Sequence, residues 1–217
     1  GDHVITCLSV FCGHCGDCLT GHMSLCQNPE TKRGQDEQPR LSQNDVSVTQ
    51  FANLSSFAEQ MLVHEHAIVK IRDDMPLDRA ALIGCGVTTG VGSVFHTAKV
   101  QPGSTVAVLG CGGIGLSCIN GAALAGAGRI IAIDMVDSKL EMAKTFGATD
   151  TINGSDGKVV DQVRELTGGG VHYSFEAIGL KATAEQAFSM LRQGGTATVI
   201  GMIPVGVKIE LMGSAFL

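Results

Sequence analysis

The chain has 217 residues, of which 44% are apolar and 17% charged, and this composition argues against a disordered protein because it offers ample surface to bury. Its 15 Lys and Arg against 21 Asp and Glu give a formal net charge of −6, which disfavours a nucleic acid or an acidic membrane as partner. No residue from 100 to 128 is charged, but Pro102, Asn120 and several glycines interrupt the stretch. We therefore expect a strand, a turn and a helix there rather than a membrane span.

The first part of the chain carries weak signals of secondary structure. Residues 1–28 are rich in Cys and Gly, and the polar residues 29–45 predict an exposed loop. Apolar runs at 61–63 and 67–69 predict short strands, which would place His64 and His66 on one half-exposed strand face. Pro76 then opens a predicted helix.

After residue 103, strands and helices alternate regularly. The predicted strands are 105–109, 129–134, 149–152, 171–176 and 196–200, and the predicted helices are 113–125, 137–146, 158–166 and 182–191. Asp137 is the expected N-cap of the second of these helices. Such alternation predicts a parallel sheet covered by helices on both faces, the doubly wound α/β fold. A sixth strand, which a complete dinucleotide fold of this kind contains, is not evident.

A glycine-rich turn joins the first of these strands to its helix. Residues 110–115, Gly-Cys-Gly-Gly-Ile-Gly, match the pattern G-x-G-x-x-G. In this pattern Gly110 makes the tight turn, Gly112 admits a pyrophosphate, and Gly115 lets the helix pack closely. The N-terminus of the helix offers free N–H groups to the phosphates. The turn therefore predicts dinucleotide binding on a Rossmann-type sheet.

Asp134 lies about 20 residues after the glycine turn, at the end of the next strand. A carboxylate there accepts hydrogen bonds from an adenosine ribose and repels a 2′-phosphate, so NAD is favoured over NADP. Lys139 either reaches the same ribose or is an ordinary solvated helix lysine.

Four cysteines follow the spacing Cys12-x2-Cys15-x2-Cys18-x7-Cys26. Four thiolates this close together can surround one structural Zn²⁺ ion tetrahedrally and leave no open position. An iron–sulfur cluster and disulfides are the alternatives, but the last spacing departs from the common iron–sulfur pattern, and an α/β core does not need disulfides. Zinc and free thiolates imply a reducing, cytoplasmic setting. His14 and His22, inside the same segment, are expected to be exposed loop residues.

Taken together, these motifs resemble the zinc-dependent alcohol dehydrogenases of the medium-chain dehydrogenase/reductase family. The resemblance is carried by CGHCGDCLTGHMSLC, AALIGCGVTTGVGSV, VAVLGCGGIGL, IIAIDMVDSKLEMAKTFGA, SFEAIG and VIGMIP. It implies a partial, β-rich, GroES-like catalytic domain at 1–86 with a structural zinc lobe at 7–28, followed by an NAD-binding Rossmann domain at 87–217. It also implies reversible oxidation of an alcohol to an aldehyde or ketone by hydride transfer to NAD, with zinc as Lewis acid.

The resemblance assigns roles position by position. The expected metal ligands are Cys12, Cys15, Cys18 and Cys26 for the structural zinc and Cys85 for a separate catalytic zinc. Thr89 is expected beside the nicotinamide in the catalytic site. The expected cofactor contacts are Gly110, Gly112, Gly113, Ile114, Gly115, Asp134, Lys139, Ala177, Ile178, Ile200 and Met202. Within this set, Ala177 and Ile178 are expected on the adenine side, and Ile200 and Met202 at the carboxamide.

The chain also departs from the family pattern. The other catalytic zinc ligands, the start of the proton relay and the C-terminal return of the catalytic domain are not identifiable, so we expect an inactive internal fragment of a longer enzyme. Cys85 alone cannot hold a catalytic zinc ion. Two alternatives are a zinc-stabilised NAD(H)-binding module without turnover and an iron–sulfur electron carrier. The full-length protein is expected to form homodimers or homotetramers.

Overall fold

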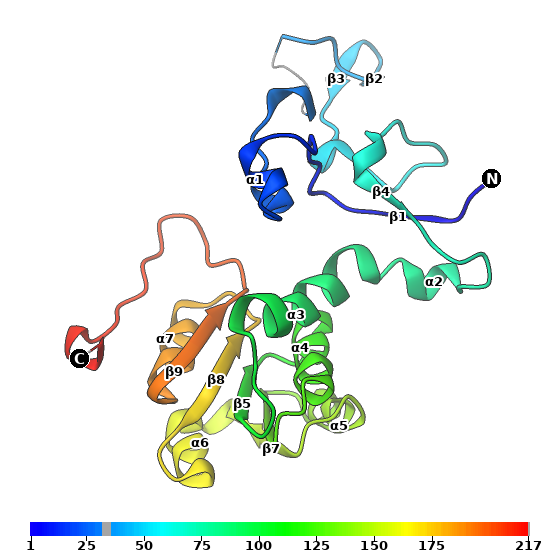
Figure 1. Cartoon of the computed structure of the whole chain (residues 1–217). Helices are drawn as coiled ribbons and strands as arrows, with labels where there is room; N and C mark the ends of the chain where they lie inside the picture. Colours follow the sequence, from blue (N-terminus) through cyan, green and yellow to red (C-terminus); the bar gives the residue numbers. More distant parts are fainter. Residues whose placement is uncertain (32–35, 217) are drawn as a thin grey trace. The chain divides into compact units, whose positions relative to one another are not determined.

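A computed structural model of the chain describes residues 1–31 and 36–216 (Figure 1). The chain divides into two units, Gly1–Cys85 and Gly86–Leu217. The units differ in the length of their strands and in how much of each is buried.

Short elements joined by loops make up the first unit. Its strands are β1 (Val4–Thr6), β2 (Leu41–Gln43), β3 (Val46–Val48) and β4 (Ile68–Lys70), and its α-helices are α1 (Gly16–Leu19) and α2 (Leu77–Ala80). Single 3₁₀ turns lie at Met23–Leu25, Pro29–Thr31, Phe51–Asn53 and Glu65–Ala67. β1 pairs with β4 and β2 with β3, both antiparallel. Asn44 and Asp45 make the two-residue turn between β2 and β3 with φ angles of 51° and 62°, as a type I′ turn requires.

Some predictions for the first unit are wrong. Residues 61–63 form no strand, and His64 and His66 lie at the Glu65–Ala67 turn rather than on a strand. His64 Nδ1 accepts a hydrogen bond from the backbone N–H of His66 at 3.0 Å, so the side chain caps the turn and replaces strand pairing. Residues 41–43, predicted as loop, form the exposed strand β2.

The second unit holds a parallel sheet and its covering helices. Its strands are β5 (Thr105–Leu109), β6 (Arg129–Asp134), β7 (Asp150–Asn153), β8 (Val171–Glu176) and β9 (Leu191–Val199). Its α-helices are α3 (Thr88–Gly92), α4 (Gly113–Leu124), α5 (Asp137–Thr145), α6 (Val159–Thr167) and α7 (Lys181–Ser189). π-Helical turns at Ile83–Val87 and Ser93–Ala98 flank α3, and 3₁₀ turns lie at Gly154–Asp156 and Gly213–Phe216.

Both faces of this five-stranded sheet are buried, which confirms the predicted doubly wound fold. Because side chains alternate along a strand, Val106 and Val108 of β5 pack on one face, and Ala107 and Leu109 pack on the other. The first face is covered by residues of the 93–98 turn, α4 and α5, and the second by residues of α6 and α7. The apolar runs of β5 and β6 therefore reflect burial on two sides.

The strand order β7-β6-β5-β8-β9 reverses direction between β5 and β8. β6 and β7 lie on one side of β5, and the chain then crosses over so that β8 and β9 lie on the other side. In open sheets of this kind, ligands bind outside the carboxyl ends of the strands at this reversal. The topology therefore predicts a ligand-binding site at the carboxyl ends of β5, β6 and β8.

The four predicted helices of the second unit are found with ends that differ by one or two residues, and the N-cap of α5 and the start of β9 were predicted wrongly. Asp137 is the first residue of α5 and Val136 is its N-cap, because the Asp137 carboxylate accepts a hydrogen bond from Asn153 Nδ2 at 2.6 Å instead of capping the helix. α7 ends at Ser189, and β9 begins at Leu191 rather than at residue 196. Leu191 pairs with Val171 before a bulge shifts the register, and no local sequence pattern marks such long-range pairing.

One helical run, Leu77–Ala98, is long and apolar enough to cross a membrane by length and composition alone, with 22 residues and a mean hydropathy of 1.2. Its part in the second unit packs on α4. A Cβ atom added at Gly90 would lie 2.5 Å from the carbonyl oxygen of Ile114 and 2.5 Å from the Cβ of Ser117. This close helix–helix packing accounts for the glycine at position 90.

Candidate functional site

The glycine turn connects β5 to α4 as the sequence predicts. Gly112 is the N-cap of α4, and a Cβ atom at Gly115 would overlap the carbonyl oxygen of Gly110. Gly115 is therefore needed for the helix to pack against its own turn. A Cβ atom at Gly112 or Gly113 would meet nothing within 4 Å, so the space above the helix N-terminus is open. Free N–H groups at such an end attract anions.

Asp134 joins the end of β6 to this turn. Its Oδ2 atom accepts the backbone N–H of Cys111 at 2.8 Å, and its Oδ1 atom accepts that of Val136 at 3.0 Å. The side chain is 11% exposed, and Lys139 Nζ lies 3.9 Å from Oδ2. Each carboxylate oxygen has a further lone pair for a hydroxyl donor. The carboxylate is thus fixed in place and still able to accept hydrogen bonds from a sugar.

A crevice of about 430 Å³ opens at the ends of β5, β6 and β8. Six of the predicted cofactor contacts line it, namely Gly110, Gly112, Asp134, Lys139, Ala177 and Ile178. Gly113, Ile114, Gly115, Ile200 and Met202 are not among its lining residues; Ile114 packs against the core, and Met202 is exposed. The structure therefore brings together the turn, the acid and the loop after β8, while the individual roles of all these residues stay predictions.

Cys111 lies within the glycine turn but has the properties of a packing residue. Burial, together with the nearby Asp134 carboxylate, raises the pKa of the Cys111 thiol to about 12. Burial likewise raises the pKa of Cys118 in α4 to about 12. Since the thiolate is the reactive form of cysteine, neither side chain is a nucleophile near neutral pH.

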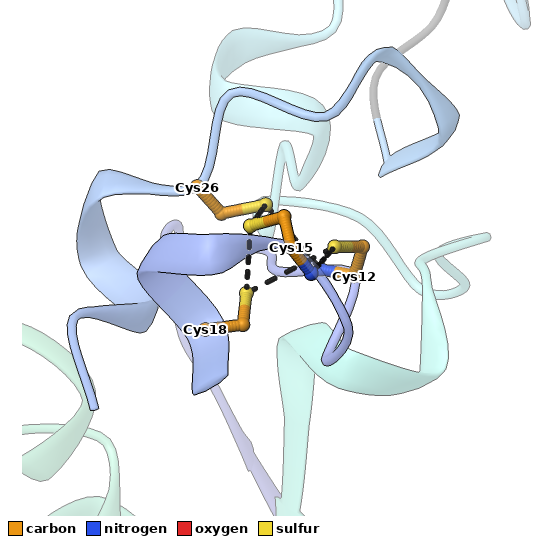
Figure 2. A group of neighbouring side chains, drawn as sticks. All are labelled: Cys12, Cys15, Cys18 and Cys26. Carbon is orange, nitrogen blue, oxygen red and sulfur yellow. Dashed lines mark hydrogen bonds between the residues drawn. The ribbon is translucent and has the colours of Figure 1, made fainter. Parts of the chain in front are cut away.

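Cys12, Cys15, Cys18 and Cys26 converge in the first unit (Figure 2). Their Sγ atoms all lie within 4.8 Å of one another. The Sγ–Sγ distances include 3.4 Å for Cys15–Cys18, 3.9 Å for Cys12–Cys18 and 3.9 Å for Cys15–Cys26. Sulfurs bound to one zinc ion at about 2.3 Å lie about 3.8 Å apart in a tetrahedron, so the donor set and its spacing fit Zn²⁺.

Backbone amides support the cysteine cluster. Cys12 N–H points to Cys26 Sγ at 3.4 Å, and Cys15 N–H points to Cys12 Sγ at 3.3 Å. A backbone hydrogen bond from His14 is the main reason why the pKa of Cys12 is lowered to about 6. The amide of Cys18 lowers the pKa of Cys15, but hydrogen bonds among the thiols, together with desolvation, outweigh it and raise that pKa to about 11. Without metal, Cys12 is therefore more readily ionised than Cys15, whereas a metal would hold all four cysteines as thiolates.

The histidines near the cluster have different surroundings. His14 and His22 are exposed, as predicted. His66 Nδ1 lies 2.6 Å from the carbonyl oxygen of Phe11, and its ring stacks on that of Phe11 with centroids 4.6 Å apart. His66 thus supports the segment that carries Cys12, a role that local sequence could not reveal because 55 positions separate His66 from Phe11.

The two remaining predicted residues are separate from these sites. Cys85 is exposed at the end of the first unit, and Thr89 is half-buried in α3. Among residues 1–31 and 36–216, the only group of three or more potential metal ligands is the Cys12–Cys15–Cys18–Cys26 cluster, so Cys85 belongs to no such group there. Its role as a catalytic zinc ligand stays a prediction.

Glu176 at the end of β8 was not predicted as a functional residue. Its side chain is fully buried, and its Oε1 atom accepts hydrogen bonds from Ile178 N, Gly179 N and Thr183 Oγ1. The available signal was an acidic residue that ends the otherwise strand-like run VHYSFE. Buried acids of this kind are rare and call for a specific explanation.

Comparison with known proteins agrees with these features. The sequence profile of the family described as zinc-binding dehydrogenase matches residues 113–216. The alcohol dehydrogenase class-3 of Oryza sativa subsp. japonica is 40% identical over 97% of this chain and 57% of that protein. The S-(hydroxymethyl)glutathione dehydrogenase of Synechocystis is 43% identical over 97% of this chain and 59% of that protein.

A solved structure supports the same relationship. The benzyl alcohol dehydrogenase of Acinetobacter calcoaceticus superposes with a TM-score of 0.87 at 32% identity, over all of this chain and 59% of that protein. The chain thus spans somewhat more than half the length of its relatives. The resemblance inferred from the motifs is confirmed: over nearly its whole length the chain is similar to part of these zinc-dependent alcohol dehydrogenases.

Proposed function

We propose that this chain provides the NAD-binding unit and the structural zinc lobe of an NAD-dependent alcohol dehydrogenase. The observation that carries the proposal is the Asp134 carboxylate, which is tied to the amide of Cys111 and lines the same crevice as Gly112. Hydride transfer between an alcohol carbon and a nicotinamide is the chemistry that the cofactor supplies when bound. The residues of this chain bind and orient it.

In this proposal the adenosine ribose hydroxyls donate hydrogen bonds to Asp134, and the diphosphate lies over Gly112 at the N-terminus of α4. Lys139, 3.9 Å from the carboxylate, is within reach of the same ribose. Asp134 would repel a 2′-phosphate, and the two residues that follow it, Met135 and Val136, carry no positive charge to accommodate one. NAD is therefore the proposed cofactor.

The test is titration of NAD and NADP into the chain and into Asp134→Gly. We expect the wild-type chain to bind NAD at least tenfold more tightly than NADP, because a carboxylate facing the 2′-phosphate costs more than about 1.4 kcal/mol. The substitution should reduce this ratio to near one. Equal affinities in the wild-type chain, or an unchanged ratio in the variant, would show that Asp134 does not select the cofactor.

We further propose that the four-cysteine cluster holds a structural zinc ion in the reducing environment of the cytoplasm, and that the whole protein oxidises a small alcohol to an aldehyde or ketone as a homodimer or homotetramer. The match of residues 113–216 to the zinc-binding dehydrogenase profile and the names of the relatives support the reaction class. Cys85 would be one ligand of a catalytic zinc ion, although it belongs to no group of three potential ligands among the described residues. Alcohol-dependent NADH formation by the full-length protein, loaded with two zinc ions per chain, tests this activity.

A further inference from the structure

Glu176 is the last residue of β8, and its side chain is fully buried. Its Oε1 atom accepts hydrogen bonds from the backbone N–H groups of Ile178 at 3.0 Å and Gly179 at 2.8 Å, and from the Thr183 hydroxyl at 2.7 Å. The first two donors belong to the loop between β8 and α7, and the third lies in the first turn of α7. One carboxylate oxygen therefore holds both the loop and the start of the helix that follows it.

The same loop packs against the glycine turn. A Cβ atom added at Gly110 would lie 2.6 Å from Ile178 Cγ1 and 3.1 Å from the carbonyl oxygen of Ala177. The backbone N–H of Ala177 donates to the carbonyl oxygen of Leu109 at 2.9 Å. Gly110, Ala177 and Ile178 line the crevice, whereas Glu176 is not among the described residues that line it. The loop therefore forms a wall of the crevice directly beside the turn, and Glu176 lies behind this wall.

The segment after β9 packs against the other side of the loop. A Cβ atom at Gly201 would lie 2.6 Å from Glu176 Oε2 and would overlap the backbone nitrogen of Gly179. A Cβ atom at Gly179, whose φ angle is +91°, would lie 2.8 to 3.0 Å from the backbone of Met202. The carbonyl oxygen of Glu176 accepts the backbone N–H groups of Ile200 at 2.8 Å and Gly201 at 3.1 Å. The loop is thus held between the glycine turn and the segment after β9, and Glu176 bonds to both the loop and that segment.

We propose that Glu176 is a positioning residue, whose carboxylate holds the loop after β8 where it fits the adenosine half of the dinucleotide. The inference rests on the proposed function, in which Ala177 and Ile178 lie on the adenine side of the crevice. Gly179 is buried, so loss of the acceptor would leave its N–H group unpaired away from water, a cost that favours rearrangement of the loop. Glu176 therefore affects the affinity for the adenosine half without touching it.

The decisive experiment measures the affinity for AMP, which carries only the adenosine half, in the 217-residue chain and in its Glu176→Met and Glu176→Gln variants. Methionine has a similar size but offers only a weak acceptor, whereas glutamine keeps a carbonyl oxygen for the three donors. We expect Glu176→Met to bind AMP at least about tenfold more weakly, and Glu176→Gln to stay within about threefold of the wild-type chain. Wild-type affinity in a folded Glu176→Met variant, or equal losses in both variants, would overturn the inference.

Hydrogen exchange and a matched control separate positioning from general stability. In Glu176→Met the backbone amides of Ile178 and Gly179 should exchange faster than in the wild-type chain, because they lose their acceptor. The Ser174 hydroxyl donates to the carbonyl oxygen of Ala187 at 2.7 Å, so Ser174→Ala removes a buried hydrogen bond between β8 and α7 outside the loop. This control should lower stability and leave AMP affinity and loop exchange unchanged. Weakened AMP binding in Ser174→Ala would contradict a specific role of Glu176.

Substitutions of Thr183 cover the case in which Glu176→Met does not fold. Thr183→Val removes one of the three hydrogen bonds to Oε1, whereas Thr183→Ser keeps the hydroxyl donor. The valine variant should bind AMP about threefold more weakly than the serine variant and exchange its loop amides faster. Equal affinities and equal exchange would refute the positioning role. If the wild-type chain binds neither AMP nor NAD, the proposed function itself is wrong, which is a different outcome from equal binding by the wild-type chain and its variants.

Discussion

In the second unit helices bury both faces of a five-stranded sheet, whereas in the first unit only Cys26, Thr31, Ala67 and Ala80 are buried among the described residues. The strands of the first unit have three residues each, and large apolar side chains such as Phe51 and Phe57 are exposed. A chain of this length with so little buried surface cannot offset the loss of conformational entropy on folding through apolar burial alone.

The comparison indicates that the two units are stabilised by different interactions. The second unit has a core of apolar side chains around β5, β6 and β8. The first unit has a cluster of four thiols, and a metal bound there would contribute free energy that the short strands do not supply. The predictions below follow from this difference.

The largest effect is expected from loss of the metal. Cys15→Ser should abolish zinc binding and unfold the first unit, because structural zinc sites contribute about 10 kcal/mol or more to folding. Zinc content by mass spectrometry and limited proteolysis measure the two consequences. Cys85→Ser, an exposed cysteine outside the cluster, is the matched control and should retain the metal. A variant of Cys15 that keeps a protease-resistant first unit would show that the cluster is dispensable.

A core substitution should affect the second unit alone. Phe175 on β8 is fully buried, so Phe175→Ala should lower the free energy of unfolding of this unit by about 3–5 kcal/mol through lost burial and the cavity left behind. Denaturant unfolding checks the loss, and zinc content should not change. Phe57→Ala, at a fully exposed phenylalanine of the first unit, should change stability by less than about 0.5 kcal/mol. Release of zinc from Phe175→Ala would contradict the independence of the two units.

These first two predictions also mark what the sequence can and cannot reveal. The strands at 105–109, 129–134 and 171–176 were predicted with correct boundaries. The first two contain continuous apolar runs, which identify strands buried on two faces, and the third follows three consecutive glycines. The first unit gave no such periodicity, and the strand predicted at 61–63 does not exist. Elements of three residues depend on their partners in space rather than on a local pattern.

The same contrast applies to the candidate sites. The cysteine spacing and the glycine turn lie within short stretches of sequence, so the cluster and the approach to the crevice could be predicted directly. The buried environment of Glu176 could not be predicted from the sequence, because it is formed by Gly201 and by donors from the loop before α7, which the fold brings together. The early start of β9 was missed for the same reason, since Leu191 is defined as strand by its pairing with Val171.

A smaller effect is expected at the glycine turn, where a substitution should weaken NAD binding and leave the stability of the second unit nearly unchanged. Gly112→Ala adds a methyl group into open space at a φ angle of −80°, so the free energy of unfolding should change by less than about 1 kcal/mol. The methyl group would occupy the position proposed for the diphosphate, and the affinity for NAD should fall at least tenfold, which is about 1.4 kcal/mol. Calorimetric titration measures the binding constant of NAD for the wild-type chain and for the Gly112→Ala variant. Unchanged affinity would place the diphosphate elsewhere.

The smallest effect concerns the reactivity of the metal-free cluster. Because hydrogen bonding lowers the pKa of Cys12 to about 6, its thiolate fraction should rise through pH 6, whereas Cys15, with its pKa raised to about 11, should stay protonated at neutral pH. Iodoacetamide at pH 7 should therefore alkylate Cys12 before Cys15 in zinc-free protein. Peptide mass spectrometry across pH 5–9 follows the order of labelling. Bound zinc should protect both thiols, and the reverse order would contradict the assigned environments.

The division of roles between the two units is tested most directly by the affinity for NAD⁺ before and after zinc is removed with a chelator. The account predicts one zinc ion per chain at the cysteine cluster, a first unit that becomes protease-sensitive when the ion is lost, and an affinity for NAD⁺ that changes by less than about twofold because the crevice lies wholly in the second unit. Loss of NAD⁺ binding together with the metal would contradict it.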